Sequence, residues 1–156
     1  MGVMKKRRKP RQSAASQASV GITETPEDIL AAARARGRAL LARRIDEAGG
    51  LITTAEAAKR ADMSEAALTE CRCLIAMSTA DDTIGWPLFQ FETIEVMKGV
   101  MRALRKLDIS APSMQLNFFF MRFPELGSRR PIDLIREGEI DRVEIAASHY
   151  GTQGAP

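Results

Sequence analysis

The segment Pro124–Gly151 constrains the fold most, because it contains two short helical patterns separated by a glycine. Pro131 stands where the first position of a helix tolerates a missing N–H, Gly138 separates the patterns, and Gly151 is typical of a helix end. In the second pattern the apolar residues recur every three or four positions and so share one face. Two helices this short must pack against longer helices, so the segment predicts a mainly α fold.

The order of residues in this segment resembles the Xre/MbcA/ParS toxin-binding domain, a family of small antitoxins. The resemblance rests on Pro-Glu-Leu-Gly at 124–127, Pro-Ile-Asp at 131–133 and Arg-Glu-Gly-Glu at 136–139, followed by an amphipathic helix that ends in Tyr-Gly. It covers residues 92–153. It implies a bacterial protein that masks a toxin through its C-terminal part and commonly binds DNA through its N-terminal part.

By the same resemblance the partner would be a RES-type toxin, an NAD-consuming enzyme whose active site the antitoxin occludes. The flexible end, residues 151–156, could enter a cleft of that enzyme. For Arg129 and Asp133, intramolecular pairing across the helix start is an equally open alternative. The residues expected to bind the toxin are Glu125, Gly127, Arg129, Arg130, Asp133, Arg136 and Glu139.

Residues 51–77 predict a helix-turn-helix. Thr53 with Glu56 forms a capping box, and Ser64 begins a second helix that we expect to reach about Leu74. A polar turn and an apolar return over residues 84–91 then predict a small hairpin, or wing. The module resembles the winged helix-turn-helix of excisionase-like and MerR-like DNA-binding proteins. We expect its aromatic residues to pack the wing onto the helices.

The charge of this module complicates DNA binding. The second helix exposes Glu65 and Glu70 beside a single cation, Arg72, and carboxylates repel phosphates within a Debye length of about 8 Å. Affinity would therefore come mainly from residues around the helix and from the N-terminal arm. A protein-only scaffold is the open alternative. The residues expected to bind DNA are Lys5, Lys6, Arg7, Arg8, Lys59, Arg60, Ser64, Thr69 and Arg72.

The basic character of the chain belongs to its start. The formal net charge is +3, but six cations lie among residues 5–11, so the remainder is acidic overall. We expect residues 1–24 to form a disordered basic arm that either contacts DNA phosphates or only aids solubility. Thr25-Pro26 then begins a helix that ends before Gly49-Gly50. The predicted domains are thus 1–24, the winged module 25–91 and the toxin-binding domain 92–153.

Two further helices are expected in the C-terminal half. Residues 92–107 form an amphipathic pattern, which favours a core helix over a homodimer seam. Its predicted stripe contains Ile94, Met97, Met101, Leu104 and Leu107. The next pattern begins at Pro112-Ser113 and is apolar nearly all round, so it should be the centre of the C-terminal core.

Several classes of function are excluded by what the sequence lacks. No glycine-rich phosphate loop or nucleophile elbow is present, so we expect neither catalysis nor a cofactor. On a continuous helix Cys71 and Cys73 would point apart, which predicts neither a disulfide nor a metal site. No apolar run approaches the roughly 20 residues of a membrane span. We therefore expect a cytoplasmic antitoxin-like regulator, with a stand-alone transcriptional regulator or a protein adaptor as alternatives.

Overall fold

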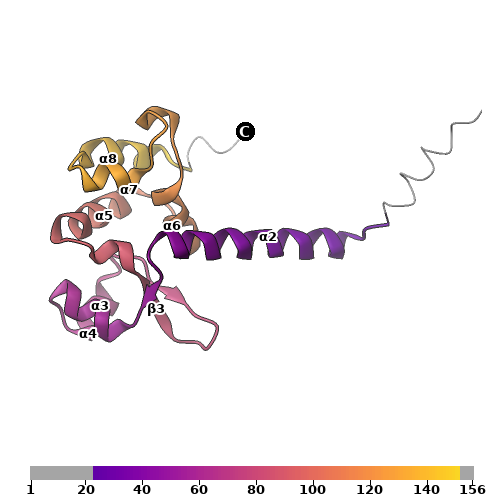
Figure 1. Ribbon diagram of the computed structural model, residues 1–156, viewed down its shortest axis with the longest axis horizontal. Helices are drawn as coiled ribbons and strands as arrows, with labels where there is room; N and C mark the ends of the chain where they lie inside the picture. Colours follow the sequence, from indigo (N-terminus) through magenta and orange to yellow (C-terminus); the bar gives the residue numbers. More distant parts are fainter. Residues whose placement is uncertain (1–22, 152–156) are drawn as a thin grey trace, which may run out of the picture. The chain divides into compact units, whose positions relative to one another are not determined.

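The computed structural model describes residues 23–151, which are mainly helical (Figure 1). The predicted arm contacts Lys5, Lys6, Arg7 and Arg8 and the end of the chain, residues 152–156, lie outside this range. None of the described helices is long and apolar enough to cross a membrane. The helices are α2 (Pro26–Glu47), α3 (Thr54–Ala61), α4 (Glu65–Cys71), α5 (Ile94–Lys106), α6 (Pro112–Phe120), α7 (Pro131–Arg136) and α8 (Ile140–His149), with short 3₁₀ helices η1 (Leu88–Phe91) and η2 (Pro124–Leu126).

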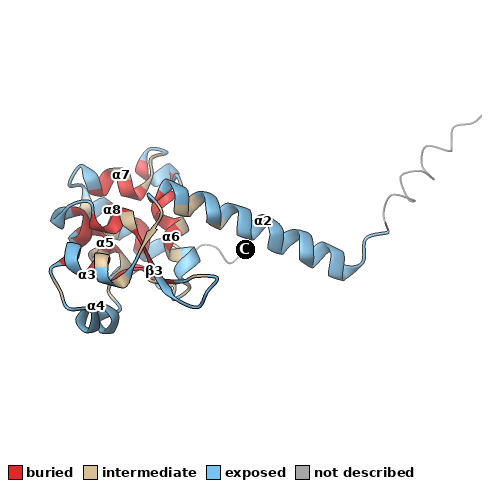
Figure 2. Cartoon of the chain, turned by 60° about the horizontal axis from the view of Figure 1, so that its bottom comes forward, coloured by how far each residue is buried: buried red, intermediate tan, exposed pale blue. Residues whose placement is uncertain are grey.

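The chain divides into two compact units after Ala39, within α2. This helix begins as its sequence predicts: the Asp28 N–H donates to Thr25 Oγ1 at 3.1 Å, and the Thr25 N–H donates to Asp28 Oδ2 at 3.0 Å. No residue of α2 is buried, and Figure 2 shows most of the helix exposed. Ile29 and Leu30 keep 54% and 52% of their surface accessible. Leu41 and Ile45, near the end of the helix, are partly buried against the core.

Two capped helices and a small sheet follow α2. The Thr53 side chain accepts from the Glu56 N–H at the start of α3, and Ser64 accepts from the Ala67 N–H at the start of α4. Strands β2 (Met77–Ser78) and β3 (Ile84–Pro87) pair antiparallel, as expected for a hairpin. The predicted return is shorter than expected, because residues 88–91 form η1. Strand β1 (Leu51–Ile52) pairs with the other side of β3 and had no signal in the sequence pattern.

The end of α4 corrects the prediction for the two cysteines. The helix stops at Cys71, three residues before the predicted end at Leu74. It stops there because Arg72 takes a left-handed conformation with φ of 50°. Cys73 therefore leaves the helical path, and its Cα lies 5.2 Å from that of Cys71. The two residues form a disulfide, contrary to the expectation from a continuous helix.

Helix α5 packs against α7 and α8 through a face that matches the predicted stripe only in part. Met97 and Leu107 of that stripe are buried, whereas Ile94 remains 45% exposed. The other buried residues include Val96, Gly99 and Val100. Gly99 permits this close approach, because a Cβ there would lie 2.7 Å from Ile135 Cγ2. The absence of a side chain at Gly99 thus shifts the contact face away from Ile94.

Helix α6 supplies much of the aromatic core, as predicted from its apolar sequence. Phe118 contacts Phe123 and Tyr150, with ring centroids 5.3 Å apart in both pairs. Phe89 in η1 contacts Phe119 and Phe120 at centroid distances of 5.5 and 5.2 Å. Trp86, Phe89 and Phe91 are all buried, which confirms their expected packing role. A single apolar cluster therefore joins the sheet region to the C-terminal helices.

Candidate functional site

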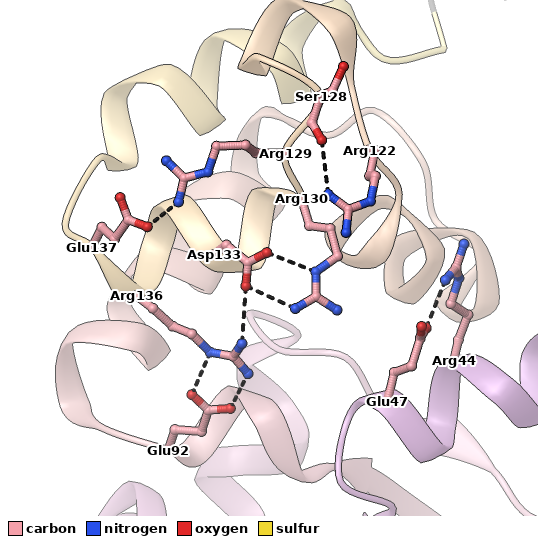
Figure 3. Close-up of polar contacts among 10 residues, drawn as sticks. All are labelled: Arg44, Glu47, Glu92, Arg122, Ser128, Arg129, Arg130, Asp133, Arg136 and Glu137. Carbon is pink, nitrogen blue, oxygen red and sulfur yellow. Dashed lines mark hydrogen bonds and ion pairs between the residues drawn. The ribbon is translucent and has the colours of Figure 1, made fainter.

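The residues expected to contact a toxin lie along one stretch, from η2 through α7 to the start of α8. Their arginines occupy the loop before α7 and its last turn (Figure 3). We call Arg129, Arg130, Asp133 and Arg136 the arginine rim. Each member of the rim has an intramolecular partner, so its geometry is set before any partner protein arrives.

Arg130 and Asp133 form a two-point ion pair across the start of α7. Arg130 Nε donates to Asp133 Oδ2 at 2.8 Å, and Nη2 donates to Oδ1 at 2.9 Å. The guanidinium carbon also lies 5.6 Å from the centroid of the Phe120 ring. The hydrogen bonds from Arg130 lower the pKa of the Asp133 carboxyl, while the same contact raises the pKa of Arg130.

Arg136 connects the rim to the segment before α5. Its Nη2 donates to Glu92 Oε2 at 2.6 Å and its Nε donates to Oε1 at 3.0 Å. A longer bond of 3.3 Å joins Nη1 to Asp133 Oδ1. The hydrogen bonds to Glu92 raise the pKa of Arg136. Residues 44 positions apart are thereby linked at the surface.

The remaining predicted polar residues are paired as well. Arg129 forms an ion pair with Glu137, which raises the pKa of Arg129, and Glu139 pairs with Arg142 at 2.9 Å. Arg129 and Asp133 are thus both paired within the chain, but not with each other: Arg129 pairs with Glu137, and Asp133 pairs with Arg130 and Arg136. The Arg129 and Arg130 side chains stay 37% and 26% exposed, so the rim remains accessible at the surface.

Of the two predicted residues that precede the rim, Glu125 lines a groove, whereas Gly127 ends η2 with φ of 69° and is not part of the lining. The groove has a volume of about 310 Å³ between η2 and α8. Ile145 is 58% exposed there, although α8 buries Val143 on its other side. Ile145 was not among the residues predicted to bind the toxin, although an isoleucine outside the apolar face of α8 was a signal for it. The groove is lined by Glu125, Leu126, Arg142, Ile145, Ala146 and His149.

The expected DNA contacts within the described range lie on α3 and α4. Arg60 pairs with Glu56 at 2.9 Å, and the Ser64 hydroxyl is used to cap α4. The Thr69 hydroxyl donates to the Glu65 carbonyl at 2.9 Å. Lys59 and Arg72 are exposed. Arg72 and Lys59 are therefore the cations of this group that make no ion pair within residues 23–151.

The described residues contain no group of three or more His, Cys, Asp or Glu side chains arranged to hold a metal. Gln90 is fully buried, but it is used structurally: it accepts from the Ile75 N–H at 2.6 Å and donates to the Ile75 and Pro87 carbonyls. Comparisons with family models, curated proteins and solved structures found no match. The surfaces of the chain itself are therefore the basis for a functional proposal.

Proposed function

We propose that this chain is an antitoxin-like regulator of the bacterial cytoplasm that masks a toxin through its C-terminal helices. In this proposal α3, α4 and the β2–β3 hairpin act as a winged helix-turn-helix that binds operator DNA. The resemblance of residues 124–151 to Xre/MbcA/ParS antitoxins gives the toxin class, a RES-type enzyme. The exposed Ile145 in the groove between η2 and α8 carries the proposal for the toxin-binding surface.

Exposed apolar surface next to ordered polar groups is what a protein partner requires. Binding energy at interfaces concentrates on a few apolar or arginine anchors that lose their water. Ile145 is 58% exposed and supplies such an anchor. A partner that covers it also contacts Glu125 and Arg142, which line the same groove.

The rim arginines support this role despite their intramolecular bonds. A guanidinium has five N–H donors. Arg129 uses one of them on Glu137 and Arg130 uses two on Asp133. The remaining donors can bind carboxylates of a partner, and the existing ion pairs reduce the side-chain entropy that binding costs.

Growth rescue tests the toxin-binding half of the proposal. The chain is co-expressed with the toxic enzyme encoded beside its gene, and we expect growth to recover. Ile145→Asp places a charge in the groove and should abolish rescue. Ile94→Asp is the matched control, since Ile94 is 45% exposed and lies outside the groove. Rescue that survives Ile145→Asp, or is lost equally with Ile94→Asp, contradicts this surface.

DNA binding rests on the exposed ends of α3 and α4. Lys59, Thr69 and Arg72 are exposed and can reach a phosphate backbone, while the capped helices fix their positions. We expect the full chain to bind its own promoter with an affinity that falls steeply with salt, because each phosphate contact releases counterions. A gel-shift series over salt concentration measures this.

Glu65 and Glu70 favour a second candidate function, a protein adaptor that does not bind DNA, since both are exposed on α4. Failure to bind the promoter at low salt, with growth rescue intact, would establish the adaptor. The variant Lys59→Gln further separates a DNA-binding regulator from a protein adaptor. It should weaken promoter binding and leave rescue unchanged.

A further inference from the structure

A cleft at the C-terminal end of α4 has features that neither toxin binding nor the core explains. It has a volume of about 320 Å³ and lies between the end of α4, β3 and the start of α6. A smaller cleft of about 170 Å³ adjoins it, because both are lined by Arg72, Leu74 and Gln115. Arg105 of α5 lines the smaller part. Arg72 lines both clefts and Arg105 the smaller one, so two arginines from distant positions in the sequence border adjoining spaces.

These two arginines differ from those of the rim. Neither Arg72 nor Arg105 makes an ion pair with any carboxylate in residues 23–151. Arg72 has its backbone in the left-handed region at φ of 50°, and the disulfide joins the residues on either side of it. A non-glycine residue in this conformation costs free energy and is found mostly where the surrounding structure holds it. The position of Arg72 at the cleft is therefore fixed by the chain on both sides.

The rest of the lining is mixed in character. Leu74, Ala76, Trp86 and Pro112 form an apolar wall, and the exposed Ser110 adds a hydroxyl group. Gln115 Nε2 donates to the Ile109 carbonyl at 2.8 Å, which fixes the orientation of the Gln115 amide. An apolar wall with a few fixed polar groups is the usual composition of a small-molecule site, and volumes of about 300 Å³ and above are typical.

We propose that this cleft binds a small organic anion, with a flat apolar body against Leu74 and Trp86 and a phosphate or carboxylate between Arg72 and Arg105. Paired guanidinium groups recognise these anions through charge-assisted hydrogen bonds. The cleft volume limits the ligand to about the size of a nucleoside monophosphate or an aromatic acid. The proposal does not depend on toxin binding, but Thr69 and Arg72 line this cleft and also belong to the proposed DNA surface. Titration of the chain without DNA therefore tests the cleft by itself.

Binding can be measured through Trp86, the only tryptophan of the chain, because it lines the cleft. The probe is 1-naphthyl phosphate, titrated into the full chain by tryptophan fluorescence and calorimetry. We expect saturable binding at a single site per chain. 1-Naphthoate should bind as well, inorganic phosphate alone should bind weakly, and neutral 1-naphthol should bind at least about tenfold more weakly than the anions, since it makes no bond to a charged group.

Substitutions at Arg72 and Arg105 test whether these two residues bind the anion. Arg72→Asn removes the charge but keeps a residue that tolerates the left-handed conformation, and should weaken binding of 1-naphthyl phosphate about tenfold or more. Arg105→Gln should weaken it as well. Lys106→Gln removes the same charge one residue along α5, outside the cleft, and should leave the affinity unchanged. Circular dichroism verifies that each variant is folded.

Three outcomes would overturn the proposal. The first is no saturable binding of either anion to the wild-type chain. The second is equal affinity for 1-naphthol and 1-naphthyl phosphate, which would show that the arginines do not act on the anion. The third is an equal loss in Lys106→Gln and Arg72→Asn, since net charge alone would then explain the affinity.

Discussion

Helix α2 and the group formed by α5, α7 and α8 contain the same residue types in different surroundings. Each region has a helical glycine and several arginines. A Cβ at Gly37 of α2 would meet nothing within 4 Å, whereas one at Gly99 of α5 would meet Ile135 at 2.7 Å. Arg43 makes no ion pair within residues 23–151, whereas Arg136 is held by Glu92. The structural role of a glycine or an arginine in this chain is therefore decided by its contacts rather than by its residue type.

The largest effect expected from this comparison concerns the two glycines. Gly99→Ala forces a methyl group against Ile135 and should lower the free energy of unfolding by about 2 kcal/mol, even after the gain in helix propensity. Gly37→Ala has the opposite sign, because nothing opposes a gain of up to about 1 kcal/mol in the local stability of α2. Urea unfolding followed by Trp86 fluorescence measures the first change, and amide exchange within α2 measures the second. Stability changes of the same sign in Gly99→Ala and Gly37→Ala would contradict the difference between the two helices.

An arginine pair gives the next largest effect. Arg130→Ala leaves Asp133 without its two-point partner and removes the contact with Phe120, so we expect a loss of about 1 kcal/mol in the free energy of unfolding. Arg43→Ala in α2 removes an exposed guanidinium and should change that free energy little. Urea unfolding of both variants at neutral pH measures the difference. A comparable loss in Arg43→Ala would show that α2 arginines have partners of equal weight.

The smallest effect is a pH dependence at Asp133. Because the pKa of Asp133 is lowered in the folded chain, its contribution is complete above the unfolded value of 3.8 and is lost as the pH falls through the folded pKa. Wild type should therefore exceed Asp133→Asn in stability at neutral pH, and the difference should shrink in acid below 3.8. Unfolding curves over a pH series measure it. Asp108→Asn serves as the control, since Asp108 is exposed and makes no ion pair in the described range.

Local signals in the sequence placed most of the helices correctly. Thr25, Thr53 and Ser64 cap helices where the sequence predicts, because capping involves residues only three positions apart. Pro131 begins α7 and Gly151 follows α8 for similar local reasons. The hairpin of β2 and β3 also followed from a short polar turn between apolar residues.

Two of the errors came from contacts between distant residues. Strand β1 exists because Leu51 and Ile52 pair with β3, more than thirty positions later. The buried face of α5 depends on how closely Gly99 lets α7 and α8 approach. The first two outcomes needed the arrangement of several elements at once. The disulfide was a local error: it depends on the left-handed turn at Arg72, a conformation that the arginine at that position does not predict.

The sequence by itself determined the mainly helical composition, the capped helix starts and the apolar character of α6, because these depend on neighbours within about one helical turn. Only the tertiary structure decided that Arg130 and Arg136 are paired, that Ile145 is exposed beside η2, and that Arg72 and Arg105 border adjoining clefts. The physical reason is that an ion pair or a cleft requires side chains within a few ångströms of each other. Packing sets those distances between residues that are far apart in the chain.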